Sequence, residues 1–335
     1  MSEVGDMHTV HYRSPADRQL TSFTEMNGSL NNCLFVNVTS IMDVVQFAIY
    51  IPTIIIGFIL NTFALWIFCF SIKKHTESSI YLLNLALLDF CLVLSLPFRL
   101  HFSQSNIIVS RQMCSFLESL YFTNMYGSIY TIMFISVDRY IAIKHPFLSK
   151  LLRSPRKTFF VCFFIWVFVW TVALCTFNFQ NDLRHSRCFH NMSGDIWSTH
   201  IIVPLQIFGF LIPMTVMLYC SIHIIKTLLV PVSSSVQFEV SKVNVIRIII
   251  SNLVVFLLSF SLSHIGIFLQ FLVRKQVISN CLVKKHISLF VQVALCIANI
   301  NCCLDAVTYY YMRKEFRNKL VPMHSQMSKS INAIT

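Results

Sequence analysis

The sequence predicts an all-α membrane protein, a seven-transmembrane helix bundle followed by a short amphipathic eighth helix. Two observations lead to this fold class. Of the 335 residues, 56% are hydrophobic and only 12% are charged, whereas a soluble globular protein carries about 25% charged residues. The apolar residues also gather in long runs, and a membrane-spanning helix needs about 20 of them. The scarcity of charge indicates lipid as the solvent around most of the chain.

Seven apolar runs reach this length. They cover residues 44–71, 79–101, 112–143, 158–179, 197–229, 243–273 and 285–311. Several exceed the minimum, so we expect these helices to tilt or to project beyond the bilayer. Prolines stand singly inside the runs, which predicts kinks rather than breaks. After the last run, Arg313–Leu320 places Phe316 and Leu320 one turn apart among basic residues, as in a helix that lies on a membrane surface.

The domain organisation expected from these runs is simple. A polar tail covers residues 1–43, the membrane domain covers 44–311, and the surface helix with a second tail covers 312–335. The first 40 residues lack an apolar core behind a basic start, so we expect no cleavable signal peptide. The net charge is +12, but the basic residues form short clusters between apolar runs. We therefore expect no nucleic-acid partner.

Basic clusters and glycosylation motifs predict the orientation. Most Lys and Arg residues lie in four segments, at Lys73-Lys74, Lys144–Lys157, Lys226–Lys242 and Arg313–Lys319. Such segments face the cytoplasm, although a smaller group falls on the other side, at Arg274, Lys275, Lys284 and Lys285. Three Asn-x-Ser/Thr motifs, which mark glycosylation of exported segments, also lie on that other side, at Asn27, Asn37 and Asn191. We therefore expect a multi-pass plasma-membrane protein with an extracellular N-terminus.

Four of the twelve cysteines lie outside the apolar runs or at their outer ends. Cysteines within the runs are expected to be small buried apolar residues. Cys114 and Cys188 both lie on the predicted extracellular side, where disulfides persist, and we expect them to form a bridge. Cys33 and Cys281 are a second candidate pair, which would tie the N-terminal tail to the last outer loop.

Several polar side chains lie inside the predicted spans, where an ionisable group is costly unless it faces the bundle and finds partners. Asp89 lies in the middle of the second run, and Ser128 lies in the third. Asn301, Asp305 and Tyr309 recur every four residues and so share one face of the seventh helix. The oxygens of Asp89, Ser128, Asn301 and Asp305 form a candidate Na⁺ site. The alternative is a water-filled network that only fixes helix packing.

Asp138-Arg139-Tyr140 ends the third run. Arg139 follows Cys114 by 25 residues, which is about 37 Å along a helix. This distance is a bilayer with part of its headgroups, so Cys114 is expected at the outer surface and Arg139 at the inner one. Taken alone, an Asp-Arg pair at a helix end is usually an ordinary surface ion pair.

As a set, these motifs resemble the rhodopsin-like G-protein-coupled receptors over residues 45–320. The resemblance rests on their order and spacing, through Asn61, Asn84–Asp89, Asp138-Arg139-Tyr140, Trp166, Pro213 and Asp305–Tyr309. It implies transmission contacts at Ile129, Pro213 and Phe256. It also implies a switch in which the sixth span moves outward, frees Arg139 from Asp138 and opens a cytoplasmic cleft for a heterotrimeric G protein.

Three positions depart from the family pattern. Ala306 replaces the usual proline of the seventh span, and Phe260-Ser261-Leu262 stands where Trp-x-Pro is common in the sixth. The bend in the sixth span therefore needs another origin. Ser221 takes the place of an inner tyrosine, with Tyr219 nearby. These departures keep open a switch that uses other side chains, or a non-signalling decoy.

Within the family, the chain is similar to the receptors for lysophosphatidylinositol. The strings that carry this likeness are Leu94–Phe98, Tyr126–Ser128, Leu152–Lys157, Cys188–Ser193, Phe268–Arg274 and Asn301–Asp305. The likeness implies an anionic lysolipid ligand, a basic ligand contact at Arg99 with Glu118 and Tyr121, and coupling to Rho- and phospholipase-linked G proteins. Another small anionic ligand, or a peptide, is the alternative.

The chemistry of this implied pocket is reasonable. Arg99 lies about 15 Å outward of Asp89 along its helix, and arginine suits bidentate capture of phosphate. Glu118, Tyr121 and Met125 follow helical spacing on one face of the third span. Arg274 and the lysines near it would attract an anion, or would only anchor the helices at the interface. An Arg99–Glu118 ion pair is the alternative to ligand contact, and His264 is expected to be a packed or hydrogen-bonded residue.

Two other classes of protein are less favoured. A transporter would show internal repeats or glycine-interrupted half-helices, and the sequence has neither. An enzyme is not expected, because the loops contain no metal-ligand cluster and no arrangement of nucleophile and base.

Overall fold

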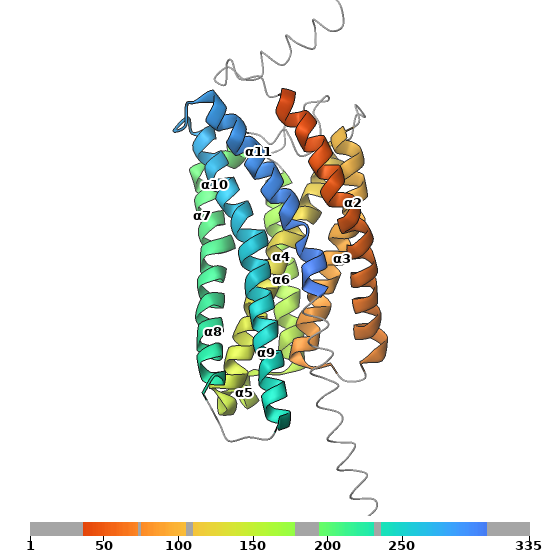
Figure 1. Ribbon diagram of the computed structural model, residues 1–335, viewed down its shortest axis with the longest axis vertical. Coiled ribbons are helices and arrows are strands. Elements are labelled where there is room, and N and C mark those ends of the chain that lie inside the picture. The colour runs from red at the N-terminus through yellow and green to blue at the C-terminus, as the bar shows by residue number, and fades with distance from the viewer. Residues whose placement is uncertain (1–35, 73–74, 105–109, 178–193, 231–235, 307–335) are drawn as a thin grey trace, which may run out of the picture.

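The computed structural model describes residues 36–72, 75–104, 110–177, 194–230 and 236–306. These residues form an elongated bundle of helices without a strand (Figure 1). The first four spans are α2 (Val36–Trp66) with its π-helical extension η1 (Ile67–Ser71), α3 (Glu77–Gln104), α4 (Arg111–Lys144) and α6 (Pro155–Phe177). The short helix α5 (Pro146–Leu152) links α4 to α6.

The last three spans are each built from more than one helical piece. The fifth comprises α7 (Thr199–Gln206), the π-helix η3 (Ile207–Leu211) and α8 (Ile212–Leu228), preceded by the 3₁₀-helix η2 (Gly194–Trp197). The sixth comprises α9 (Val236–Val255), the π-helix η4 (Phe256–Ser261) and α10 (Leu262–Arg274). The seventh begins with α11 (Cys281–Ala298), turns at residues 299–300 and continues as helix over 301–306.

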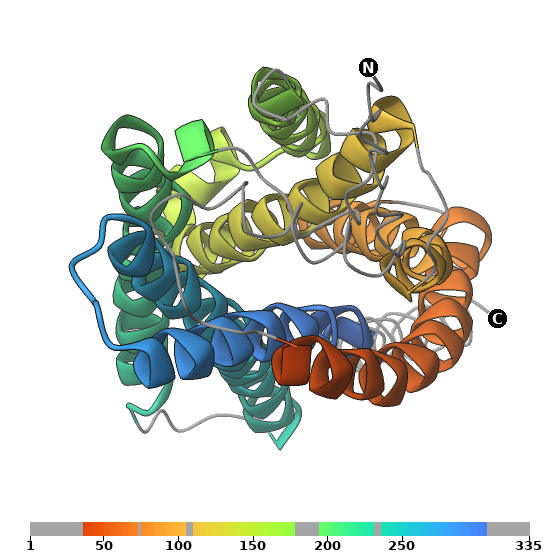
Figure 2. The same ribbon diagram turned by 90° about the horizontal axis from the view of Figure 1, so that it is seen from above.

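Within the part of the chain that the structure describes, six helical segments are long and apolar enough to cross a membrane, at Ile41–Phe70, Glu77–Phe102, Pro155–Cys175, Thr199–Leu228, Lys242–Arg274 and Cys281–Ala306. Each coincides with a predicted run. The predicted third span is α4, a helix of 34 residues, which is long enough but more polar. Seen from above, α4 runs through the middle of the bundle (Figure 2), in contact with α3, α6 and α8. A helix covered by other helices needs no lipid-facing surface, so it tolerates polar residues.

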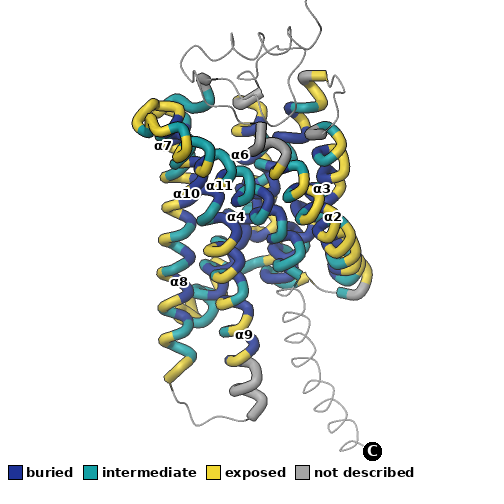
Figure 3. The backbone as a smooth tube through the Cα atoms, turned by 45° about the horizontal axis from the view of Figure 1, so that its top comes forward, coloured by how far each residue is buried: buried dark blue, intermediate teal, exposed yellow. Residues whose placement is uncertain are grey.

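Burial follows the same arrangement. Exposed residues lie on the outer faces of the bundle and buried residues on the inner faces (Figure 3). The exposed residues include many large hydrophobic side chains, among them Phe58 on α2, Phe164 on α6 and Phe208 on η3. Exposed apolar surface of this extent is unfavourable in water and suits contact with lipid. We call the end of the bundle where α4 begins the Cys114 end, and the opposite end the Arg139 end.

Irregular helix geometry occurs in both spans that lack the family's proline. The π-helix η4 occupies Phe256–Ser261, the place where the family's Trp-x-Pro is absent. In the seventh span, the amides of Asn299 and Ile300 donate to carbonyls three residues back, at 3.2 and 2.9 Å. A π-helical turn and a 3₁₀-like turn both interrupt α-helical geometry and often mark functional positions. In the sixth span, the π-helix η4 is thus a source of irregular geometry that does not need a proline.

Candidate functional site

A cluster of buried polar residues lies where α3, α4 and the seventh span approach one another. Asp89, Ser128, Asn301 and Asp305 are all fully buried. Asn124 donates to the Asp89 carboxylate at 3.0 Å, and Asp305 lies close enough to Asp89 to interact electrostatically. Two ionised carboxylates only accept hydrogen bonds, so their approach requires a cation or a shared proton.

The oxygens of this cluster are unevenly satisfied. Among the described residues, the Ser128 hydroxyl, the Asn301 amide and both Asp305 oxygens have no hydrogen-bond partner. Nearby polar residues do have partners, since Asn84 donates to Thr131 at 2.8 Å and accepts from the Trp166 indole at 2.7 Å. Buried polar groups are normally paired, and hard oxygens of this kind suit a small cation. Tyr309, the third member of the predicted face, lies outside the described residues.

Arg99 lies buried toward the Cys114 end, with 9% of its surface exposed. Its guanidinium carbon is 4.5 Å from the ring centre of Tyr121 and 5.6 Å from that of Tyr50. Glu118 interacts with it electrostatically. The Tyr121 hydroxyl donates to the Leu295 carbonyl at 3.4 Å. The predicted trio of Arg99, Glu118 and Tyr121 is therefore brought together.

Tyr50 is a member of this site that sequence reasoning missed. Its hydroxyl accepts from the Asn299 amide at 3.2 Å, so it ties the first span to the irregular turn of the seventh. An aromatic residue in an apolar run carries no signal that would connect it with Arg99, a residue of another helix. Its role emerges only from the packing.

The other two predicted ligand residues lie elsewhere. Met125 packs in the hydrophobic core with Tyr126 and Ile129. Arg274, the last residue of α10, is exposed, and its guanidinium lies 5.9 Å from the Trp197 ring centre. Its position matches the alternative of an interfacial anchor.

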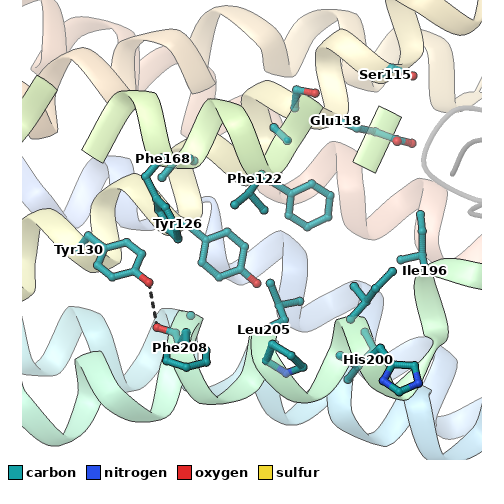
Figure 4. Close-up of a pocket in the computed structure, with 18 residues that line it drawn as sticks. Ser115, Glu118, Phe122, Tyr126, Tyr130, Phe168, Ile196, His200, Leu205 and Phe208 are labelled. Atoms are coloured by element: carbon teal, nitrogen blue, oxygen red, sulfur yellow. Dashed lines mark hydrogen bonds between the residues drawn. The ribbon is translucent and has the colours of Figure 1, made fainter. Parts of the chain in front are cut away.

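A cavity of about 490 Å³ lies between α4, α6, α7 and η3 (Figure 4). Its walls are mostly aromatic and aliphatic. Ser115, Glu118 and Ser119 contribute polar atoms at its Cys114 end, and Phe168 and Phe208 lie farther along. These two phenylalanines are 50% and 59% exposed, so the cavity borders the lipid-facing surface. Glu118 belongs to the cavity and also interacts with Arg99, which joins the two features into one site.

At the Arg139 end, Asp138 has a charged partner that the sequence did not predict, Arg153. The Asp138 carboxylate accepts two hydrogen bonds from Arg153, from Nε at 2.7 Å and from Nη2 at 3.0 Å. The same Nη2 lies 3.3 Å from Glu77. Asp138 is thus paired with Arg153 at the link between α5 and α6, and Arg139 beside it is also buried. The reason is geometric, because the planar guanidinium fork of Arg153 matches a carboxylate.

The remaining switch residues divide into two groups. Ile129 and Phe256 are fully buried in one cluster, and Phe256 stacks on Phe210 with ring centres 5.9 Å apart. Tyr140 instead packs against Tyr219 at 5.8 Å on the outside of the bundle. Tyr219 is exposed while Ser221 is buried, so Tyr219 does not replace the missing inner tyrosine.

Cys114 and Cys281 are each disulfide-bonded. Their predicted partners, Cys188 and Cys33, lie outside the described residues, as do the glycosylation candidates Asn27 and Asn191 and the predicted helix Arg313–Leu320. Asn37 belongs to the first turn of α2.

Comparison with known proteins agrees with this arrangement. The family described as "7 transmembrane receptor (rhodopsin family)" matches residues 60–309. The chain is 42% identical over 317 residues to G-protein coupled receptor 55 of Mus musculus, covering 91% of this chain and 97% of that protein. It is 44% identical over 293 residues to the Homo sapiens protein of the same name, covering 85% and 90%. It is 36% identical over 266 residues to lysophosphatidic acid receptor 6 of Gallus gallus, covering 77% and 86%. The chain therefore belongs to the rhodopsin family of seven-transmembrane receptors.

Proposed function

We propose that this receptor binds an extracellular anionic lysolipid, with lysophosphatidylinositol as the first candidate, and signals to Rho- and phospholipase-linked G proteins. The Cys114 end faces the outside of the plasma membrane and the Arg139 end faces the cytoplasm. The observation that carries the proposal is the buried cation at Arg99, joined through Glu118 to an apolar cavity beside the lipid. A lysolipid has the matching parts, an anionic headgroup and one acyl chain.

The phosphate is the part that Arg99 recognises. A guanidinium binds phosphate through two parallel hydrogen bonds, and these are strong where water is excluded. The Tyr50 and Tyr121 rings hold the guanidinium by cation–π contact. In the free receptor Glu118 balances part of its charge. An arriving phosphate competes with that carboxylate, and the difference in their interactions biases the helix packing.

The acyl chain occupies the cavity between α4, α6 and the fifth span. Its volume of about 490 Å³ lies within the roughly 300–1,000 Å³ typical of ligand pockets. Phe168 and Phe208 are exposed toward the lipid, so a chain can enter from the membrane without crossing water. Several relatives are lysophosphatidic acid receptors, and lysophosphatidic acid belongs to the same chemical class.

Na⁺ is the ion that the buried cluster of Asp89, Ser128, Asn301 and Asp305 fits. Its carboxylate, amide and hydroxyl oxygens are hard ligands, and several have no hydrogen-bond partner among the described residues. A bound cation would neutralise the close approach of Asp89 and Asp305. It would thereby stabilise the packing in which α3 and the seventh span lie together.

The cytoplasmic end offers a surface for a G protein. Helix α5 contains no buried residue, and Phe147 is 88% exposed. An apolar side chain presented in this way on a short helix suits insertion into a partner.

Ligand binding acts by population shift, because an outer ligand changes the equilibrium only by its differential affinity for the two packings. The irregular η4 and the turn at residues 299–300 provide adaptable points, which favours a signalling receptor over a decoy.

Cells that express the chain test this proposal. They are treated with lysophosphatidylinositol while activation of each G-protein class is recorded, and surface expression is measured in parallel. We expect Arg99→Ala to lower potency by about 30-fold or more, because loss of a buried charged partner costs roughly 2–5 kcal/mol. Lys275→Ala is the matched control, an exposed outer cation, and should change potency by less than about fivefold.

Two negative results have different meanings. No response in any G-protein class, with the receptor present at the surface, would refute the ligand. Unchanged potency in Arg99→Ala, together with a wild-type response, would refute only the headgroup anchor.

A further inference from the structure

Two buried polar atoms have no hydrogen-bond partner among the described residues, the hydroxyl of the cavity residue Tyr126 and the Nε2 nitrogen of its neighbour His264. Tyr126 lines the cavity and is 7% exposed, whereas His264 packs against the Tyr126 ring and is 1% exposed. Their rings meet edge to face, with centres 5.8 Å apart and planes at 78°. Since buried polar groups are normally satisfied, two neighbouring exceptions indicate a missing group.

A second tyrosine of the same cavity shows the contrast. Tyr130 follows Tyr126 by one helical turn, and its hydroxyl donates to the Phe208 carbonyl at 2.9 Å. Figure 4 shows this bond, and it shows the Tyr126 hydroxyl directed across the cavity toward Leu205. The Tyr130 hydroxyl is therefore satisfied within the protein, whereas the Tyr126 hydroxyl is available to a different partner.

The protonation of His264 follows from its one hydrogen bond. Its Nδ1 lies 2.9 Å from the Phe260 carbonyl oxygen. A carbonyl only accepts, so Nδ1 carries the proton, and the Nε2 of the neutral ring is an acceptor. The Tyr126 hydroxyl is a donor as well as an acceptor. Two residues whose rings are in contact thus offer a donor and an acceptor, and neither atom has a partner among the described residues.

The π-helices η3 and η4 hold both residues in place. A Cβ atom on Gly209 of η3 would lie 2.7 Å from Tyr126 Cε1, so only glycine allows the ring this close. Phe210 of η3 stacks on His264, with ring centres 4.5 Å apart and planes at 11°. Phe260, which accepts from His264, belongs to η4. Irregular turns of this kind often mark functional sites.

We propose that Tyr126 and His264 form a subsite for a hydroxyl group of the ligand. The Tyr126 hydroxyl donates to the ligand oxygen, and the ligand hydroxyl donates to His264 Nε2. A plain hydrocarbon chain would leave both atoms unsatisfied, whereas a hydroxyl has the donor and the acceptor that the pair requires.

This subsite rests on the proposed function and names the part of the lysolipid that it selects. A lysolipid differs from a diacyl lipid in having a free hydroxyl on its glycerol. Tyr126 follows Tyr121 by five residues, which places it about 7.5 Å deeper along α4. Glycerol lies between the phosphate, held at Arg99, and the acyl chain, and so reaches this depth.

The same pair connects the ligand with the sixth span. His264 stacks on Phe210, and Phe210 stacks on Phe256 of η4 at 5.9 Å. A ligand hydroxyl bound to His264 therefore acts on the ring stack at the irregular turn of the sixth span. Recognition of the lysolipid and movement of this span share one set of contacts.

The test compares lysophosphatidylinositol with its analogue in which the free glycerol hydroxyl is replaced by hydrogen. Binding is read as the thermal shift of the purified full-length receptor, and signalling is measured separately in cells. We expect the wild type to prefer the hydroxyl form by about tenfold or more, because the analogue leaves two buried groups unpaired. Tyr126→Phe and His264→Phe should lose this preference. Tyr130→Phe, the matched control, should retain it.

Each outcome decides between the claims. A wild type that binds both lipids equally, or a Tyr126→Phe variant that still prefers the hydroxyl, overturns the subsite and leaves the proposed function intact. An equal loss of affinity for both lipids in Tyr126→Phe assigns the hydroxyl to water and also overturns it. A hydroxyl-dependent thermal shift without signalling supports the subsite and refutes the signalling function. No shift with either lipid refutes both.

Discussion

Arg153 donates two hydrogen bonds to the Asp138 carboxylate, from Nε at 2.7 Å and from Nη2 at 3.0 Å. The same Nη2 lies 3.3 Å from the Glu77 carboxylate. One side chain at the link between α5 and α6 thus connects the start of α3 with the end of α4. Asp138 and Glu77 would repel each other across this junction without a cation. The segment that joins α5 to α6 is therefore fixed to the bundle by these contacts.

Loss of the Arg153 fork should destabilise the bundle. We expect Arg153→Gln to lower the free energy of unfolding by about 1–3 kcal/mol, since it removes two charge-assisted hydrogen bonds from the largely buried Asp138 carboxylate. Arg153→Lys keeps the charge but loses the bidentate geometry, so its effect should be intermediate. Thermal unfolding in detergent measures the change. Arg156→Gln, an exposed cation of the same segment, is the control, and an equal loss there would contradict the assignment.

Sodium should stabilise the receptor through the buried carboxylates. Replacing N-methylglucamine with Na⁺ at constant ionic strength should raise the unfolding temperature. An ion that binds only the folded state adds about 2.7 kcal/mol to the free energy of unfolding at a hundredfold excess over its Kd. Asp305→Asn should abolish the response. A sodium effect of undiminished size in that variant would place the ion elsewhere.

Phe147 on α5 should contribute to G-protein contact without contributing to folding. We expect Phe147→Ala to weaken G-protein binding by about 1–2 kcal/mol, as apolar anchors of interfaces do, with unchanged thermal stability, since the side chain is 88% exposed. Nucleotide exchange on purified G protein is the measurement. Lys150→Ala on the same short helix is the matched variant, and an equal loss there would argue against a specific apolar anchor.

Gly209 should prove intolerant of alanine because of Tyr126. The added Cβ would lie 2.7 Å from the ring, and overpacking of this kind costs about 1–3 kcal/mol. A double-mutant cycle tests the cause, since the cost of Gly209→Ala should largely disappear in a Tyr126→Leu background. Additive effects of the two changes would mean that the strain arises from another neighbour.

The fold was largely predictable because bilayer thickness leaves a strong mark on sequence. The run at 112–143 corresponds to α4 at Arg111–Lys144, and the i, i+4 spacing of Asn301 and Asp305 led to a buried polar face. Arg99, Glu118 and Tyr121 came from the family resemblance, and the structure brings them together. These features depend on local periodicity, or on a motif that can be read in one segment.

Other parts of the site had no local signal. Tyr50 and Arg153 act on residues of different helices, and nothing in the segment around either residue reports that contact. The π-helix η4 contains no proline or glycine that distinguishes it from ordinary helix. His264 was expected to be packed or hydrogen-bonded, and its bond to Phe260 confirms this. Its second nitrogen became informative only when the structure showed Tyr126 beside it.

The polarity of α4 has a consequence for biogenesis. Lipid alone accepts a helix only when its apolar residues outweigh the cost of its polar ones, and α4 is the span that depends most on its neighbours. Its stable insertion would require α3 and α6, and later the fifth span, to pack against it and cover Asn124, Thr131 and Ser136. Membrane insertion of this chain is thus a cooperative act of several helices. Substitutions on the helices that surround α4 would then appear first as retention in the endoplasmic reticulum, before any defect in signalling can be measured.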